Sequence, residues 1–149
     1  MRLALKIVRP TSILEIGFNL GHSSLFWLRN TPAKVVSVDV KIDGRVLESV
    51  KECEKYNGRF KFYDRKYAPL VNGQFDFAFI DGSHGFEDVV KDIEWCSSLG
   101  ITNLLLDDWF TLYGDTKRAV LASGLKIVFI SGNQVLISNS DKYDQFYGT

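Results

Sequence analysis

Short runs of consecutive apolar residues, separated by stretches of helical periodicity, constrain the fold of this chain more than any other feature. Runs such as VVSVDV, FDFAFI and NLLL are apolar at successive positions rather than only at alternate ones. Strands of this kind are buried on both faces, which is typical of parallel sheets covered by helices on both sides. The sequence therefore predicts an α/β fold in which strands and helices alternate.

The same pattern predicts seven strands, which share a high content of apolar and β-branched residues. The expected strands are Ser12–Ile16, Val35–Val40, Phe60–Tyr63, Phe75–Ile80, Asn103–Leu106, Leu125–Ile130 and Gln134–Ser138. Only Ser131, Gly132 and Asn133 separate the last two strands, which is hairpin length, so this pair must be antiparallel. We therefore expect a doubly wound, mostly parallel seven-stranded sheet of Rossmann-like type that ends in an antiparallel hairpin.

Helices are expected from apolar residues that recur with helical spacing between these strands. One begins near Ser23, and others span Arg45–Tyr56, Phe86–Leu99 and a short stretch from Asp115 to Gly124. Ser83 and Asp115 are expected as N-caps, because their side-chain oxygens can accept from the first helical N–H groups. Gly100 and Gly124 are expected to end their helices.

Composition limits the classes of function. A chain of 149 residues with 46% hydrophobic residues predicts a single domain over residues 1–149 with its own core. The formal net charge of zero gives no support to nucleic acid or an anionic membrane as a partner. Two cysteines cannot build a disulfide scaffold, and no apolar run approaches the ~20 residues that span a bilayer. We therefore expect a soluble, cytoplasmic protein.

A glycine-rich turn directly follows the first expected strand, in the segment EIGFNLGHSS. Glycines let the backbone approach a ligand closely, and the helix that follows presents unpaired N–H groups and a positive dipole end. The dinucleotide fingerprint G-x-G-x-x-G would need glycine at positions 19 and 22, where this chain has Asn19 and His22. Asp39 ends the second strand about 20 residues later, where a carboxylate can accept from ribose hydroxyls. These residues predict a nucleoside site, with nicotinamide cofactors disfavoured.

The glycine turn resembles motif I of the class I S-adenosylmethionine-dependent methyltransferases, E-x-G-x-x-x-G, which Glu15, Gly17 and Gly21 match. The expected order of strands, with its terminal hairpin, resembles the same family over nearly the whole chain. The resemblance implies S-adenosylmethionine as cofactor, and Asp64, just after the third strand, near the adenine amino group. The residues expected at the cofactor are Glu15, Gly17, Asn19, Gly21, His22, Ser23, Asp39, Asp64 and Asp81.

Two later segments resemble a subgroup of small-molecule O-methyltransferases, namely I-D-G-x-H at residues 80–84 and the pair Asp107-Asp108. In the metal-dependent members, residues at these positions hold a magnesium-type ion, and the matching residues are Asp81, Asp107 and Asp108. Oxygen ligands suit Mg²⁺, Ca²⁺ or Mn²⁺. Without a cation, a basic neighbour or a proton, such carboxylates would repel by roughly 4 kcal/mol per pair at 4 Å. Adjacent strand residues point to opposite faces, so Asp107 and Asp108 can share a site only beyond the strand end.

Catalytic candidates follow from the same segments. His84 is the natural general base, because an imidazole can take a proton near neutral pH, and Asp81 is placed beside it. The alternative for His84 is a cap on the next helix or a contact with adenine. Trp109 and Phe110 are candidates for the wall of an acceptor pocket, with ordinary packing as the alternative.

The expected function is methyl transfer from S-adenosylmethionine to an oxygen of a small-molecule or sugar-like acceptor. Ile80-Asp81-Gly82-Ser83 stands where methyltransferases acting on base or amide nitrogens carry N-P-P-[YF], which favours oxygen. The alternatives are a non-catalytic nucleoside-binding module of the same fold and another nucleoside-using enzyme. The seven strands and their helices use nearly all of the 149 residues and leave little for a lid over the acceptor site. We therefore expect either a homodimer, in which the partner closes the cleft, or an acceptor that is large or exposed.

Overall fold

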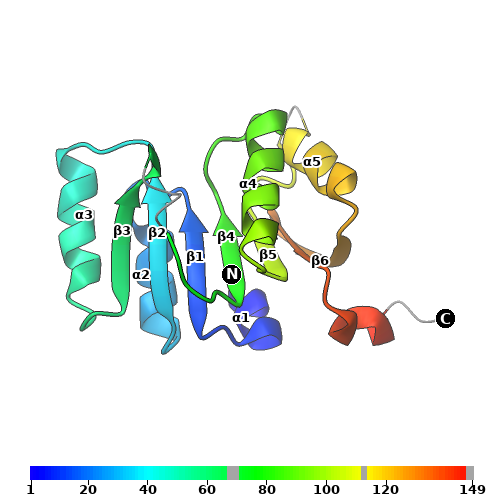
Figure 1. Ribbon diagram of the computed structural model, residues 1–149, viewed down its shortest axis with the longest axis horizontal. Helices are drawn as coiled ribbons and strands as arrows, with labels where there is room; N and C mark the ends of the chain where they lie inside the picture. The colour runs from blue at the N-terminus through cyan, green and yellow to red at the C-terminus, as the bar shows by residue number, and fades with distance from the viewer. Residues whose placement is uncertain (67–70, 112–113, 147–149) are drawn as a thin grey trace.

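The computed structural model describes residues 1–66, 71–111 and 114–146, which form one seven-stranded sheet flanked by helices (Figure 1). The strands are β1 (Ser12–Ile16), β2 (Lys34–Asp39), β3 (Phe60–Asp64), β4 (Phe77–Ile80), β5 (Asn103–Leu106), β6 (Lys126–Ser131) and β7 (Gln134–Ser138). The helices are α1 (Arg2–Val8), α2 (His22–Asn30), α3 (Gly44–Glu54), α4 (Phe86–Ser98) and α5 (Asp115–Ser123), followed by a 3-10 segment at Asp141–Phe146. The predicted α/β architecture is confirmed.

The strands lie in the order β3-β2-β1-β4-β5-β7-β6. The strands β3, β2, β1, β4 and β5 run parallel to one another, so the carboxyl ends of β1 to β4 meet at one edge, at the top of Figure 1. Strand β7 is antiparallel to both β5 and β6, as the short connection predicts. Ser131 pairs with Gln134, so the turn consists of Gly132 and Asn133 alone, and a bulge between Ile127 and Phe129 shifts the register of β6.

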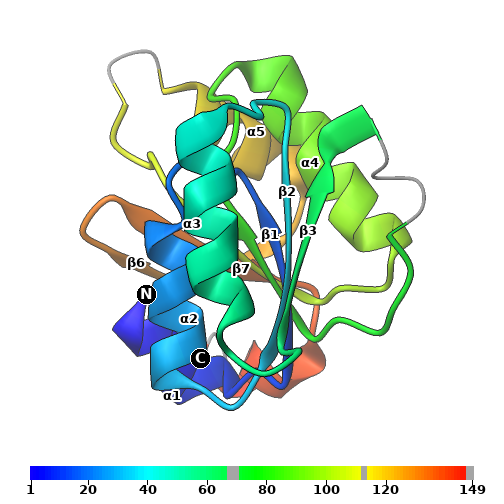
Figure 2. The same ribbon diagram turned by 90° about the vertical axis from the view of Figure 1, so that its left-hand side faces the viewer.

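Helices cover both faces of the sheet, α1, α2 and α3 on one and α4 and α5 on the other (Figure 2). Successive residues of β1 divide between the two layers: Ile13 packs in the core under α1 to α3, and Leu14 packs in the core under α4 and α5. Both side chains are fully buried. This double burial is the physical reason for the continuous apolar runs in the sequence.

Strands β1, β5 and β7 have the predicted boundaries, and those of the other four differ by one or two residues. Strand β2 ends at Asp39, and Val40 beyond it is 79% exposed, because the chain turns away from the sheet at this point. Strand β4 begins at Phe77 rather than Phe75. The Asp76 carboxylate instead accepts from the backbone N–H of Thr11, at 2.9 Å to Oδ2, and so binds the start of β1.

The helix ends also differ in detail. Gly85, not Ser83, is the N-cap of α4, and Gly114, not Asp115, is that of α5. Helix α3 is capped by Asp43, whose Oδ1 accepts from the N–H groups of Arg45 and Val46 at 3.0 and 3.1 Å. Helix α1 was not expected from the sequence, because only one of its residues, Ala4, is buried. No helix in the described ranges is long and apolar enough to cross a membrane.

Candidate active site

A cavity of about 640 Å³ opens at the carboxyl ends of β1, β2 and β4. Its walls come from the glycine turn, the ends of β2, β3 and β4, and the first half of α4. The lining residues are Ile16, Gly17, Asn19, Val38, Asp39, Val40, Lys41, Arg65, Asp81, Gly82, Ser83, His84, Asp88, Lys91 and Asp92. Of the predicted site residues, the structure brings Gly17, Asn19, Asp39, Asp81 and His84 to this cavity. Its place at the switch between β1 and β4 is where ligands bind in such sheets.

Gly17 sits at the floor of the cavity, where the ends of β1 and β4 touch. Its φ is +96°, and a Cβ at this position would lie 2.1 Å from the backbone oxygen of Asp81. Hydrogen bonds fix both strands around it, from the Gly17 N–H to Val38 at 2.9 Å and from the Asp81 N–H to Ile16 at 2.8 Å. Only glycine fits here, and it leaves the backbone open to a ligand.

Asp39 shapes the glycine turn. Its Oδ2 accepts from the N–H groups of Phe18 and Asn19 at 2.8 and 2.7 Å, and its Oδ1 accepts from the Lys41 N–H at 2.8 Å. Oδ2 is thereby saturated, whereas Oδ1 keeps a second lone pair that can accept from a hydroxyl group. The role expected from the sequence, binding of ribose, is compatible with this placement and stays a prediction.

Glu15 is fully buried between β1, β2 and α2 and does not line the cavity. Its Oε2 accepts from the hydroxyl groups of Ser24 and Ser37, the latter at 2.6 Å. Burial raises the pKa of the Glu15 carboxyl, and the surrounding hydroxyls oppose that rise. Its position indicates that it ties the turn to the sheet, and its predicted contact with a cofactor stays a prediction.

Three further residues of the glycine turn lie outside the described cavity lining. Gly21 has φ +71° and caps α2, and a Cβ on it would lie 2.7 Å from the ring of Phe18. Ser23 is in the first turn of α2. His22 is exposed and lines a separate surface hollow together with residues of α3.

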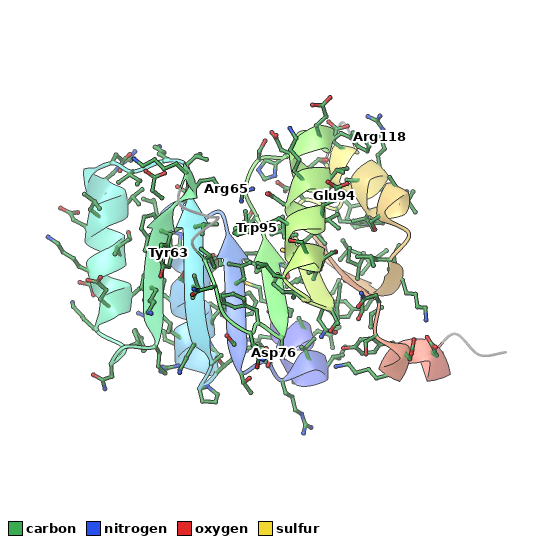
Figure 3. All side chains as sticks on the ribbon, viewed as in Figure 1. Tyr63, Arg65, Asp76, Glu94, Trp95 and Arg118 are labelled. Atoms are coloured by element: carbon green, nitrogen blue, oxygen red, sulfur yellow. The ribbon has the colours of Figure 1, made fainter. Side chains whose placement is uncertain are left out.

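At the end of β3, the cavity is lined by Arg65 rather than by the predicted Asp64. Asp64 is engaged locally, because its Oδ2 lies 2.8 Å from the ammonium nitrogen of Lys66, and this contact lowers the pKa of the Asp64 carboxyl. Arg65 instead forms an ion pair with Asp92 on α4, and its guanidinium lies 4.9 Å from the ring centre of Trp95 (Figure 3).

Sequence reasoning missed Arg65 and Asp92. Asp92 is 4% exposed although it carries a carboxyl group. A signal for it exists in the sequence: it follows Val89 by three positions and so falls on the buried face of α4. A charge on an apolar helix face needs a partner, and Arg65 provides it.

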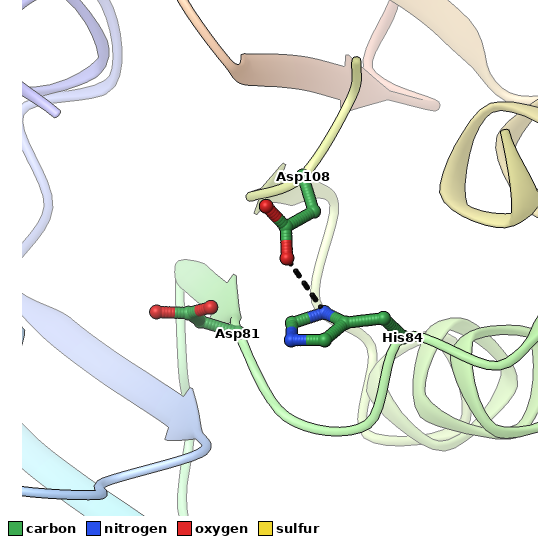
Figure 4. Close-up of side chains that lie close together, drawn as sticks. All are labelled: Asp81, His84 and Asp108. Atoms are coloured by element: carbon green, nitrogen blue, oxygen red, sulfur yellow. Dashed lines mark ion pairs between the residues drawn. The ribbon is translucent and has the colours of Figure 1, made fainter. Parts of the chain in front are cut away.

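Asp81, His84 and Asp108 lie together beyond the ends of β4 and β5, and they offer ligand atoms within 4.8 Å of one another. The Nδ1 atom of His84 lies 2.9 Å from Oδ2 of Asp108. Figure 4 shows the second imidazole nitrogen, Nε2, turned toward the side of Asp81. Asp107 is not among these three residues.

The backbone beyond β5 explains this arrangement. Strand β5 ends at Leu106, the Asp107 N–H still donates to Ile80 at 3.0 Å, and Asp108 then adopts φ +59°. This left-handed conformation, uncommon outside glycine, turns the Asp108 side chain toward His84. Asp108 thus reaches the site because it lies beyond the end of β5, as expected from the alternation of side chains along a strand.

Two carboxyl groups at this end of the sheet have raised pKa values. Burial raises the pKa of Asp81 to about 6, with further contributions from the negative charges of Asp107 and Asp108, while His84 opposes the rise. Burial also raises the pKa of Asp107. The repulsion expected among three carboxylates is therefore relieved by the imidazole beside Asp108 and by the higher proton affinity of Asp81.

The aromatic residues after β5 divide between core and surface. Trp109 is 5% exposed and belongs to the core under α4 and α5, which is the packing alternative. Phe110 is 71% exposed. Neither residue lines the described cavity, and a contact of Phe110 with an acceptor stays a prediction.

The parallel sheet with its terminal hairpin, the glycine turn and the acidic strand ends define a Rossmann-like methyltransferase class of structure. A family described as a methyltransferase domain matches residues 14–100, more than half of the chain, and the chain belongs to this family. The resemblance inferred from the motifs is thereby confirmed. No curated protein matches the sequence significantly.

Solved structures share this fold at low sequence identity. The cofactor-bound Rv0187 from MTB has a TM-score of 0.70 and 19% identity, over 92% of this chain and 76% of its own. The O-methyltransferase TomG from Streptomyces achromogenes, in complex with SAM, has a TM-score of 0.68 and 15% identity, over 93% and 77%. The O-methyltransferase from Bacillus cereus, in complex with SAH, has a TM-score of 0.67 and 15% identity, over 93% and 78%.

Proposed function

We propose that the protein transfers a methyl group from S-adenosylmethionine to a hydroxyl oxygen of a small-molecule acceptor. The observation that carries this proposal is the placement of His84, oriented by Asp108, at the rim of the cavity that follows the glycine turn. Membership of the methyltransferase-domain family supports the reaction class. The O-methyltransferases among the similar structures, crystallised with SAM or SAH, support the cofactor and favour oxygen as the acceptor atom.

The donor site is the cavity described above, and the residues present fit a nucleoside. Gly17 leaves its floor open where a Cβ would clash, and Asp39 stands at the end of β2 with accepting capacity for ribose hydroxyls. When bound, S-adenosylmethionine supplies a methyl group on a positively charged sulfonium. The protein then has to hold the acceptor in line with that methyl group and remove one proton.

His84 is the proposed general base. In the neutral imidazole, Nδ1–H donates to the Asp108 carboxylate, so the lone pair is on Nε2, which faces the side of Asp81. Nε2 takes the hydroxyl proton of the acceptor as the acceptor oxygen forms a bond to the methyl carbon. The bond between that carbon and the sulfonium sulfur breaks, its electron pair stays on sulfur, and neutral S-adenosylhomocysteine leaves. The imidazolium later releases its proton to water. Asp108 and Asp81 flank the imidazolium and stabilise its positive charge, which is the role we assign to Asp81.

A divalent cation is the other occupant that this cluster fits. The structure groups Asp81, Asp108 and His84 rather than the three carboxylates expected from the sequence, and a set with one imidazole favours Mn²⁺, Fe²⁺ or Zn²⁺ over Mg²⁺. Such an ion would hold and acidify the acceptor hydroxyl. His84 Nδ1 is already engaged by Asp108, so the base role and ligation through Nδ1 exclude each other.

Calorimetry with S-adenosylmethionine and S-adenosylhomocysteine tests the donor site. If the protein binds neither compound, the proposal is refuted. The next measurement is formation of S-adenosylhomocysteine across a panel of phenols, catechols and sugars. The variant His84→Gln should retain binding of S-adenosylhomocysteine and lose turnover by about 10²-fold or more. Glu94→Gln, an exposed residue of α4 outside the cavity lining, is the matched control and should turn over like the unmodified protein.

The same assays separate the two alternatives. A nucleoside-binding module would bind both compounds without product on any acceptor, and another nucleoside-using enzyme would bind neither. The predicted homodimer is tested by light scattering at working concentration, where a monomer would contradict it.

A further inference from the structure

We propose that Asn133 is a positioning residue that holds the Asp108 carboxylate and thereby sets the tautomer of His84. Asn133 lies in the two-residue turn between β6 and β7, far along the chain from both residues. Sequence analysis identified it only as part of a hairpin connection. The inference rests on the proposed function, because it assigns Asn133 a role in preparing the same base.

Three hydrogen bonds join Asn133 to the segment after β5. Its Nδ2 donates to Oδ1 of Asp108 at 2.7 Å. Its Oδ1 accepts from the Phe110 N–H at 2.8 Å, and its backbone oxygen accepts from the Trp109 N–H at 2.9 Å. One residue of the hairpin therefore binds three successive residues of the turn that carries Asp108.

These contacts also fix the orientation of the side-chain amide. A flipped amide would place its oxygen against the Asp108 carboxylate and its NH₂ group against the Phe110 N–H, so both contacts would become repulsive. Only one orientation satisfies both partners. The donor aimed at Asp108 is thus held in place by the second bond, on the opposite end of the same amide.

The Asp108 carboxylate is in turn bound at both oxygens. Oδ1 accepts from Asn133, and Oδ2 faces Nδ1 of His84 at 2.9 Å. Rotation of the carboxylate would break both contacts at once, so Asn133 restricts the direction from which Asp108 accepts the imidazole proton. A fixed acceptor at Nδ1 favours the Nδ1–H tautomer and leaves the lone pair on Nε2. This is the same logic by which a carboxylate orients the base of a hydrolase triad.

Variants of Asn133 can separate the bonds that hold the turn after β5 from the bond that orients the Asp108 carboxylate. The backbone oxygen of Asn133, which binds Trp109, is retained in any substitution. The variant Asn133→Asp also retains an acceptor for the Phe110 N–H but places a second carboxylate oxygen against Asp108. Asn133→Ala removes both side-chain bonds. Asn139→Ala changes an exposed asparagine at the other end of β7 and serves as the matched control.

The test is long-range ¹H–¹⁵N NMR of the ¹⁵N-histidine-labelled full chain at pH about 9, where a free imidazole is neutral. We expect His84 in the unmodified protein and in Asn139→Ala to carry its proton on Nδ1. In Asn133→Ala and Asn133→Asp, the ratio of the Nδ1–H to the Nε2–H form should fall by about tenfold, the effect of a lost hydrogen bond to a charged group. With an acceptor that is turned over, kcat should fall by a similar factor while KM for S-adenosylmethionine changes by less than about twofold.

An Nε2–H form in the unmodified protein, or an unchanged ratio in both Asn133 variants, would overturn the inference. If Asn133→Ala does not fold, Asn133→Asp decides, since it keeps the bond to Phe110. Failure of the inference and failure of the proposed function are distinguishable. The tautomer is measured without any ligand, whereas the proposed function stands or falls on calorimetry and product formation.

Discussion

Replacement of Gly17 by alanine should unfold the protein at a markedly lower temperature, because the structure leaves no space for a single added carbon. The new Cβ would lie 2.1 Å from the backbone oxygen of Asp81, 2.5 Å from its carbonyl carbon and 2.8 Å from the backbone nitrogen of Gly82. All three atoms are backbone and cannot rotate away. The ends of β1 and β4 would have to separate by about 1 Å, against the hydrogen bonds that fix them.

The loss of folding stability in Gly17→Ala has two parts. Placing a non-glycine residue at φ +96° costs about 1–2 kcal/mol, and overpacking a rigid site costs about 1–3 kcal/mol. The sum of about 2–5 kcal/mol is a large share of the 5–15 kcal/mol that stabilises a typical domain. At about 2–4 °C per kcal/mol for a chain of this size, the melting temperature should fall by about 4–20 °C.

Gly58→Ala is the matched control, since Gly58 also has a positive φ, +71°, but no heavy atom lies within 4 Å of its added Cβ. It should cost only the conformational part, about 2–8 °C in the melting temperature. Thermal unfolding followed by circular dichroism measures both variants. If Gly17→Ala melts within about 2 °C of Gly58→Ala, the close approach of β1 and β4 is not what requires glycine at this position.

Further predictions concern the acidic groups. The pKa of Asp81 is about 6 in the folded chain against its ordinary value of 3.8, so the folded state binds this proton more tightly and stability should fall as the pH rises from about 4 to about 6. The melting temperature of Asp81→Asn relative to the unmodified protein should therefore rise across this window, and an unchanged difference would contradict the burial argument. Asp39→Ala should weaken binding of S-adenosylhomocysteine by about 10–100-fold in calorimetry, because it removes the acceptor of the Phe18 and Asn19 N–H groups as well as that for ribose; an unchanged affinity would exclude Asp39 from the site. Removal of divalent ions by EDTA should leave methyl transfer intact if His84 is the base, whereas loss of activity that Mn²⁺ restores would favour the metal site.

The fold was predictable because the two-sided burial of a parallel sheet leaves a direct trace in the sequence. The hairpin was predictable for a similar reason, because no crossover fits between residues 130 and 134. The parallel order brings the strand ends together, so Gly17, Asp39 and Asp81 could be placed at one site from the sequence alone. What the pattern does not contain is the boundary of each strand: β2 ends one residue earlier than predicted, and β4 begins two residues later.

The observed site differs from the predicted one where a shift of one residue, or a contact between residues far apart in the sequence, determines which side chain enters the cavity. At the end of β3, the cavity receives Arg65 and not its neighbour Asp64, because adjacent residues point in different directions. Glu15 was predicted at the cofactor, but it lies inside β1 between the buried Leu14 and Ile16, and a strand covered by helices on both faces buries it as well. Asn133 contacts Asp108 across 25 positions, and no periodicity relates the two.

The bulge in β6 has a consequence for how this protein can associate. Strand β6 is the outermost strand on its side of the described sheet, its residues are half-buried or exposed, and Ile130 is 44% exposed. A straight apolar edge of this kind would offer a ladder of unpaired N–H and C=O groups to another strand. The register shift between Ile127 and Phe129 interrupts that ladder, and the charged Lys126 stands at its start. Continuous strand addition is therefore disfavoured at the edge of the same hairpin that brings Asn133 to Asp108.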